Sequence, residues 1–432
     1  MSPVRDSVVL LGHRDGIEDQ RLRDFLTRTA QPYEWVDAGT PAAAELLARL
    51  GIDEVELPLI VADGEVLEGA TVERVVEAWR GSDGPQRSRY DLAIVGAGPS
   101  GLAAAVYSAS DGLATVVVEE DVPGGQASHT SLIENFFGFP EGIGGAELSR
   151  LAGRQAEKFG ADLVLMRGAT GSSRTPDGGF VIQIAGGYEV EAPVVLAAPG
   201  MEWRRLDVPG VDDLLGRGVL YGAGRSEAAH CAGDDVIVVG AGNSAGQAVL
   251  DLANAGGRVK MLVRGDLLGK SMSAYLVKRI EKHRGIEVRL RTEVEAVDAV
   301  GGRLGGVRVR VPEGGAEELP ARALFLCLGG VPRTGWADAT GVRLDNAGYV
   351  LTGPDLLLAE GRRPEGWPLA RDPLALETSV PGLFAAGDVR HGSVKRVGAA
   401  VGEGAMAAAL VHRRLEELDQ GDGVRPQGSD PT

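Results

Sequence analysis

The sequence predicts an α/β protein with two nucleotide-binding units of the Rossmann type, preceded by a smaller α/β unit. Residues 90–110 and 235–253 each show a buried strand, a glycine-rich turn and a helix, in that order. The 432 residues are enough for about three domains. The 64 glycines fit a chain with many tight turns and close backbone approaches.

The composition of the chain excludes several classes of partner and of site. The formal net charge of −17 argues against a nucleic-acid partner, because phosphate binding needs clustered Lys and Arg. We find no apolar run of membrane-spanning length and no signal-peptide pattern, so we expect a cytoplasmic protein with no membrane partner. Cys231 and Cys327 are too few for a disulfide framework. The six histidines lack metal-ligand spacing, so we expect no metal.

Residues 1–80 alternate strand and helix patterns in the order β-α-β-α-β-β-α, with a hairpin turn at Asp63-Gly64. This order resembles the thioredoxin/glutaredoxin fold, with Pro58 where that family keeps a cis-proline. The family's redox dithiol would follow the first strand, but "GHRDGIED" contains no cysteine. The unit is therefore predicted to dock a protein partner or to build a dimer. A polar linker, 81–89, follows it.

The first nucleotide site follows a strand at 92–95. Gly96 permits a tight turn, and Gly98 lets a pyrophosphate approach the backbone. Gly101 lets the next helix pack close to the strand, so that the helix N-terminus faces the phosphates. Glu119 ends the second strand and can accept hydrogen bonds from a ribose diol.

The second site repeats this pattern with Gly240, Gly242 and Ala245. Its second strand ends without an acidic residue, and Arg264 and Lys270 lie nearby. A ribose 2′-phosphate is therefore favoured, which predicts NADPH over NADH. The alternative for Arg264 is a solvated surface charge.

The sequence contains a third cofactor-binding signature, in which a predicted strand ends at Gly387-Asp388 and a helix begins shortly after. An Asp at this place can hold the polyol chain of a flavin, while the helix N-terminus faces the flavin ring. This segment must return to the first site, so the second site is predicted to be an insertion in the first domain. Two dinucleotides, one of them FAD, imply hydride transfer from NADPH to the flavin.

Residues 90–417 resemble the low-molecular-weight thioredoxin reductase family. The resemblance rests on "GAGPSG", "PGGQ" at 123–126, "IENFFGFP" at 133–140, "GAGNSA" and "FAAGDVR". It implies a homodimer whose FAD domain is split by the NADPH domain, with hinges near 206–209 and 327–330. It also implies that Gln126 and Asn135 lie near the isoalloxazine.

The expected domains are 1–80, thioredoxin/glutaredoxin-like without redox cysteines; 81–89, a linker; 90–206 and 327–417, FAD-binding; 207–326, NADPH-binding; and 418–432, a flexible tail. The residues expected to hold FAD are Gly96, Gly98, Pro99, Ser100, Gly101, Glu119, Gly125, Gln126, Asn135, Gly200, Gly387, Asp388, Lys395, Arg396 and Val397. Those expected to hold NADPH are Gly240, Gly242, Asn243, Ser244, Ala245, Arg264 and Lys270.

The chain departs from this family at its redox centre. The family's Cys-x-x-Cys-Asp falls on residues 223–227, Ala-Gly-Arg-Ser-Glu, which contain no cysteine. Arg225, Ser226 and Glu227 are therefore the candidate catalytic residues, Glu227 as a proton donor or acceptor and Arg225 as a stabiliser of negative charge. The alternative is a polar surface loop whose chemistry has lapsed. Cys231, a lone thiol, is interpreted as a small buried residue, and Cys327 as core.

These residues predict an FAD-dependent oxidoreductase that oxidises NADPH and reduces a small molecule or oxygen directly. Two alternatives stay open. One is disulfide reduction through a substrate's own thiols or through Cys231. The other is a flavin redox sensor or an electron-transfer module that docks a protein partner through the N-terminal unit.

Overall fold

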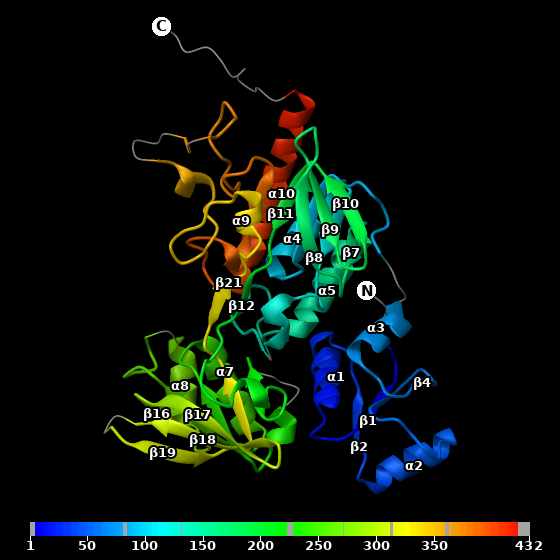
Figure 1. The fold of residues 1–432 in the computed structure, drawn as a ribbon, viewed down its shortest axis with the longest axis vertical. Coiled ribbons are helices and arrows are strands. Elements are labelled where there is room, and N and C mark those ends of the chain that lie inside the picture. The colour runs from blue at the N-terminus through cyan, green and yellow to red at the C-terminus, as the bar shows by residue number, and fades with distance from the viewer. Residues whose placement is uncertain are drawn as a thin grey trace.

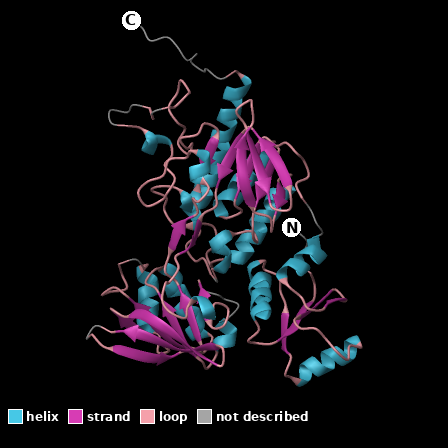
Figure 2. Ribbon diagram, viewed as in Figure 1, coloured by secondary structure: helices cyan, strands magenta, loops and turns pink. Residues whose placement is uncertain are grey.

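The computed structural model describes residues 5–80, 84–130, 132–222, 228–270, 272–311, 314–358, 363–364 and 366–421. Figure 1 shows three α/β bodies, and Figure 2 shows how helices and strands are distributed among them. We call residues 5–80 the N-terminal unit and residues 204–329 the inserted unit. The outer unit comprises the described residues before and after the insertion, 84–203 and 330–421. The domain boundaries expected from the sequence stay a prediction.

The N-terminal unit has the predicted order of elements. They are β1 (Val8–Gly12), α1 (Ile17–Arg28), β2 (Glu34–Asp37), α2 (Pro41–Leu50), β3 (Leu59–Ala62), β4 (Glu65–Leu67) and α3 (Val72–Arg80). The sheet order is β2-β1-β3-β4, with β1 parallel to β2 and antiparallel to β3. The Leu57–Pro58 peptide is cis, as expected. The resemblance to the thioredoxin/glutaredoxin fold stays a prediction.

The outer unit is built on a parallel sheet of order β22-β11-β5-β6-β7. Its strands are β5 (Leu92–Val95), β6 (Thr115–Val118), β7 (Asp162–Val164), β11 (Val194–Ala197) and β22 (Leu383–Ala385). Its main helices are α4 (Pro99–Ser110), α5 (Gly145–Lys158) and α10 (Val397–Asp419), and a second sheet contains β8 (Ala169–Arg174), β9 (Phe180–Ile184) and β10 (Tyr188–Ala192). Because β22 pairs with β11, the third sequence signature returns to the first site, as predicted.

The inserted unit has a parallel sheet of order β13-β20-β14-β15-β16. Its elements are β13 (Val219–Tyr221), β14 (Asp235–Val239), α7 (Asn243–Asn254), β15 (Arg258–Val263), α8 (Ala274–Lys282), β16 (Ile286–Leu290) and β20 (Ala323–Leu326). A three-stranded antiparallel sheet follows, with β17 (Glu293–Val300), β18 (Arg303–Arg310) and β19 (Ala316–Pro320). The antiparallel pair β12 (Met201–Trp203) and β21 (Gly330–Pro332) joins this unit to the outer unit (Figure 1).

Short helices complete the described chain: η1 (Gly125–His129), η2 (Asp212–Leu214), η3 (Ala229–Cys231), α9 (Ala337–Thr340), η4 (Gly353–Leu356) and η6 (Gly387–Val389). Within the described residues, no helix combines the length and apolar character that crossing a membrane requires.

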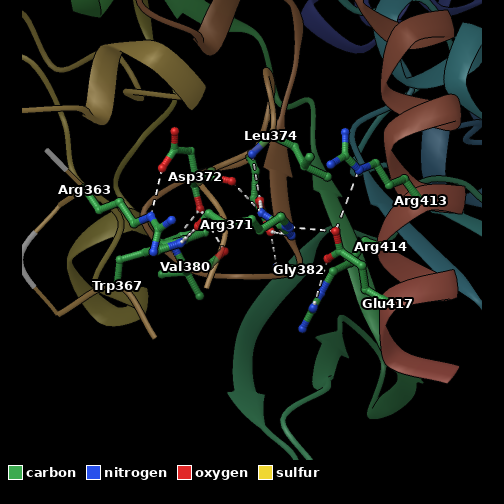
Figure 3. A network of polar contacts seen from close by, with 12 residues as sticks. Arg363, Trp367, Arg371, Asp372, Leu374, Val380, Gly382, Arg413, Arg414 and Glu417 are labelled. Atoms are coloured by element: carbon green, nitrogen blue, oxygen red, sulfur yellow. Dashed lines mark hydrogen bonds and ion pairs between the residues drawn. The ribbon is translucent and has the colours of Figure 1, made fainter. Parts of the chain in front are cut away.

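A buried carboxylate fixes the backbone of the segment that precedes β22. Glu377 is fully buried, and its two oxygens accept hydrogen bonds from the backbone N–H groups of Leu374 and Gly382 at 2.9 and 3.1 Å. Arg371 donates to both oxygens, at 2.6 and 3.2 Å, and donates through Nε to Glu417 of α10 at 2.7 Å (Figure 3). Because a buried charge is tolerated only when it is paired and hydrogen-bonded, this network fixes the segment that leads to Gly387.

Replacing Glu377→Gln should destabilise the protein, because the amide NH2 cannot accept one of the two backbone N–H bonds and the neutral amide leaves the Arg371 charge without its buried partner. We expect a loss of about 3 kcal/mol in the free energy of unfolding, measured by urea denaturation. The matched control is Asp372→Asn, which removes an exposed ion pair with Arg363 at 2.8 Å in the same segment. The control should cost less than about 1 kcal/mol. Equal effects of the two changes would contradict the role of Glu377.

Candidate active site

The first glycine turn follows β5 and leads into α4. Gly96 has a φ of +105°, and a Cβ there would overlap the carbonyl oxygen of Ala198 on the neighbouring strand segment. A Cβ on Gly101 would overlap the carbonyl oxygen of Gly96. Gly98 differs, because a Cβ built there meets none of the described atoms within 4 Å. The turn is therefore closely packed against the protein at its ends and open at its centre, where a ligand can reach the backbone.

The N-terminus of α4 offers donors at this opening. Gly98 is the N-cap residue, and within the described chain no side chain caps the helix. Pro99 occupies the first turn, where its missing N–H costs nothing. Ser100 is 4% exposed, and its hydroxyl has no hydrogen-bond partner among the described groups. An uncapped helix N-terminus and an unpartnered buried hydroxyl fit the pyrophosphate of a dinucleotide.

Glu119 ties the turn to the end of β6. One carboxylate oxygen accepts the N–H of Ala97 at 2.6 Å, and the other accepts the N–H of Asp121 at 3.0 Å. Burial raises the pKa of Glu119, and the two backbone hydrogen bonds oppose that rise. The carboxylate thus holds the turn in shape. Its expected contact with a ribose diol stays a prediction.

The Gly387-Asp388 turn lies against α4. A Cβ on Gly387, whose φ is +79°, would come within 3.1 Å of the Ser100 Cβ. Burial raises the pKa of the Asp388 carboxyl, and Lys395 opposes the rise. Lys395 donates to the Asp388 carbonyl oxygen at 2.6 Å, while Arg396 is exposed as the N-cap of α10, which begins at Val397. The structure therefore places the Gly387-Asp388 turn beside Ser100. The expected contacts of these three residues with FAD stay predictions.

Glu403, which no sequence motif singled out, positions this turn. Its carboxylate accepts the N–H of Gly387 at 2.7 Å and pairs with Arg390 at 3.0 Å. The available signal was an acidic residue within the otherwise small and apolar run of α10, "VGAAVGEGAMAAALV". Such a residue on a packed helix face usually has a partner.

The remaining expected flavin residues lie in the short helix η1 and in turns. A Cβ built on Gly125 would lie 3.5 Å from the Gly98 Cα, so the start of η1 adjoins the first glycine turn. Gln126 donates through its side chain to the Met201 carbonyl oxygen at 2.7 Å, next to Gly200, whose φ is +67°. Asn135 is exposed in a turn. The expected roles of Gln126 and Asn135 toward the isoalloxazine stay predictions.

The second glycine turn, between β14 and α7, repeats the geometry of the first. Gly240 has a φ of +147°, and a Cβ there would overlap the carbonyl oxygen of Cys327. Gly242 caps α7, and a Cβ built on it has no described neighbour within 4 Å. Ala245 is fully buried, and the Asn243 side chain accepts the N–H of Ser273 at 2.7 Å. The same open centre and uncapped helix fit a second dinucleotide.

The residues expected near the 2′-phosphate are exposed. Arg264 and Lys270 lie in the segment after β15, and Ser244 is exposed in the first turn of α7. Exposure leaves both interpretations of Arg264 open, as a phosphate ligand and as a solvated charge.

The candidate catalytic residues Arg225, Ser226 and Glu227 lie outside the described residues. The described chain stops at Gly222, where a Cβ would contact the Trp203 ring at 2.9 Å, and resumes at Ala228. Cys231 is 5% exposed, as expected for a buried thiol. Cys327 follows β20 directly and is 6% exposed, and burial raises its pKa to about 12.

Residues 90–404 match the family model described as pyridine nucleotide-disulphide oxidoreductase. A thioredoxin reductase of Bacillus subtilis is 31% identical over 334 residues, which cover 77% of this chain and 96% of the relative. A thioredoxin reductase of Treponema pallidum is 33% identical over 330 residues, or 76% and 98% of the two chains. The solved thioredoxin reductase of T. acidophilum has 26% identity and a TM-score of 0.66, covering 77% of this chain and 100% of its own.

Replacing Gly242→Ala should weaken NADPH binding alone. The new methyl group would occupy the open centre of the second turn without touching the protein, so we expect the KM for NADPH to rise about tenfold, equivalent to about 1.4 kcal/mol. FAD content and thermal stability should match the parent protein. Gly335→Ala, at an equally open position of the outer unit, is the matched control and should leave KM unchanged. An unchanged KM in Gly242→Ala would place the nucleotide elsewhere.

Proposed function

The chain belongs to the pyridine nucleotide-disulphide oxidoreductase family, and we propose that it passes electrons from FAD directly to a small acceptor or to oxygen, without an internal dithiol. It is an FAD-dependent oxidoreductase that uses FAD and NADPH, as its thioredoxin reductase relatives do. The direct transfer to the acceptor is the part that we propose.

The number and burial of the cysteines support the proposal that no internal dithiol takes part. The 432 residues contain two cysteines, Cys231 and Cys327, so no Cys-x-x-Cys occurs in the chain. A dithiol relay needs one thiolate that attacks and a second thiol that resolves the mixed disulfide. Both thiols are buried, and the pKa of Cys327 at about 12 keeps that group protonated at neutral pH.

The two glycine turns would orient the two nucleotides through backbone N–H groups and helix N-termini. FAD, when bound, supplies the hydride-accepting ring. The Gln126 side chain, held on the Met201 carbonyl oxygen, would position the ring edge beside β12. The inserted unit would present the nicotinamide through the turn at Gly242.

Gly222, the last described residue before 223–227, lies beside the expected flavin site. Gly222 lies against the Trp203 ring, and the same ring makes an edge contact with His129, with centroids 6.3 Å apart. We propose that Arg225 stabilises negative charge on the reduced ring or on the acceptor and that Glu227 moves a proton, with Ser226 between them. The placement of Gly222 supports this assignment.

We also propose that the enzyme works in the cytoplasm as a homodimer, from its resemblance to low-molecular-weight thioredoxin reductases. The acceptor would be a small molecule or oxygen rather than a protein disulfide. The alternative of a flavin redox sensor would show stoichiometric bleaching of the flavin by NADPH without turnover.

Replacing Cys231→Ser should leave turnover intact. We expect NADPH oxidation with oxygen, quinones and small disulfides to keep kcat within about twofold, because no step of the proposed transfer uses a thiol. Steady-state absorbance of NADPH measures this rate. A loss of turnover confined to disulfide acceptors would assign that chemistry to Cys231 instead.

Replacing Glu227→Gln and Arg225→Ala should lower the rate of flavin reoxidation by at least about tenfold with the physiological class of acceptor. Stopped-flow absorbance of the reduced flavin separates this step from reduction by NADPH, which should not change. Reoxidation at the parental rate with every acceptor would show that the loop is a polar surface without chemistry.

A further inference from the structure

The geometry points to an internal brace: we infer that the N-terminal unit fixes the outer and inserted units in the arrangement seen here. It does so with the loop after β1, where the thioredoxin/glutaredoxin fold that it resembles carries its redox dithiol. This inference concerns the protein chain itself and does not depend on the proposed route of electrons.

Ion pairs hold the loop after β1 on the inserted unit. Asp15 pairs with Arg303 at 2.9 Å and with Arg322 at 2.7 Å, and its carbonyl oxygen accepts a further hydrogen bond from Arg303 at 2.6 Å. Arg14 pairs with Asp234 at 3.0 Å. Single exposed pairs contribute little, but one carboxylate shared by two arginines forms a network with a defined geometry.

Ring contacts extend the same interface. The Trp35 ring of β2 makes an edge contact with His230 of η3, with centroids 5.8 Å apart. The guanidinium of Arg23, which is 1% exposed, lies 4.8 Å over the same Trp35 ring. Burial and the charges of Arg23 and Arg14 lower the pKa of His230 to about 4, so its imidazole is neutral at pH 7 and can pack without a desolvated charge.

The C-terminal end of α1 is fixed to the outer unit. Arg28, at the end of α1, pairs with Asp121 at 2.7 Å and donates to the Ser128 hydroxyl at 3.2 Å. Val122 of the outer unit is 3% exposed because it belongs to the hydrophobic core of the N-terminal unit, and Met166 packs against that core. Helix α1 therefore contacts the outer unit at its C-terminal end, while the loop before it contacts the inserted unit (Figure 1).

Two contacts on one rigid unit restrict the motion of the parts they join. The outer and inserted units are connected by the two strands β12 and β21. They also touch through two exposed contacts, the ion pair of Arg279 with Glu134 at 3.2 Å and the hydrogen bond from Gln247 to the Leu132 carbonyl oxygen at 3.2 Å. Because single exposed contacts contribute little, these connections alone would permit rotation. With the N-terminal unit in place, any rotation must break either the Asp15 network or the Arg28 contacts.

The thiol of Cys231 can report whether the contact between the N-terminal unit and the inserted unit is open. A small cavity between the two units is lined by Gly16 and Gln20 of the N-terminal unit and by Cys231 of the inserted unit. A thiol reagent reaches Cys231 from this side only when the contact opens. Cys327, buried in the core of the inserted unit, reports on unfolding instead.

The test is the alkylation rate of each cysteine in the native holoenzyme, measured with iodoacetamide and peptide mass spectrometry. Asp15→Arg places like charges at Arg303 and Arg322, so we expect alkylation of Cys231 to accelerate about tenfold while Cys327 stays unchanged. Adding Arg322→Asp should bring the rate part of the way back to the parental value, because it re-forms one of the two pairs with reversed charges while Arg303 is unchanged. Glu18→Arg, one turn further along α1 with its partner Arg21 in the same helix, is the matched control and should have no effect.

A parental rate at Cys231 in a folded Asp15→Arg variant would overturn the brace. If that variant exposes Cys327 as well, Asp15→Asn replaces it, with an expected acceleration of about threefold and the same opposing outcome. Small-angle X-ray scattering supplies the second readout. The radius of gyration should rise in Asp15→Arg and in Arg28→Gln, whereas an unchanged radius in both would show that the two units hold their arrangement without the brace.

Discussion

The close approach of a glycine turn to a neighbouring strand is the constraint on which the two nucleotide sites depend. Gly96 lies against the carbonyl oxygen of Ala198, and Gly240 lies against that of Cys327. In both turns the backbone has a positive φ and leaves no space for a Cβ, so the helix that follows starts close to the carboxyl end of the strand. That position directs the uncapped N-termini of α4 and α7 toward the space above each sheet, where phosphates bind.

Long-range polar contacts complete the first site from the other end of the chain. Glu377 fixes the segment before β22, and Glu403 fixes the turn at Gly387 after it. Both carboxylates accept backbone N–H groups and pair with an arginine, so their charges are compensated where they are buried. The packing of α10 on α4 needs a glycine at 404, since a Cβ there would overlap the Ser100 carbonyl oxygen. The candidate flavin site is thus assembled from segments about 290 residues apart in sequence.

Helices, strands and glycine turns could be predicted from the sequence because the residue patterns that indicate them are local. The glycine spacings, the strand at 92–95 and the order of elements in the N-terminal unit all follow from periodicity and turn chemistry. The roles of Glu377 and Glu403 could not be predicted, because each depends on partners that come together only in the folded chain. The contact of Asp15 with Arg303 and Arg322 was missed for the same reason, since isolated charges carry no local pattern. The proposed catalytic residues Arg225, Ser226 and Glu227 rest on alignment with a family motif rather than on geometry.

The central claim is that the flavin is the enzyme's sole store of electrons. Anaerobic titration with NADPH, followed by flavin absorbance, tests it most directly, because a hydride delivers two electrons and a redox-active dithiol would accept a second pair. The account predicts complete bleaching with about one equivalent of NADPH per FAD and no new thiols after denaturation. Uptake of about two equivalents, with two new thiols, would contradict it.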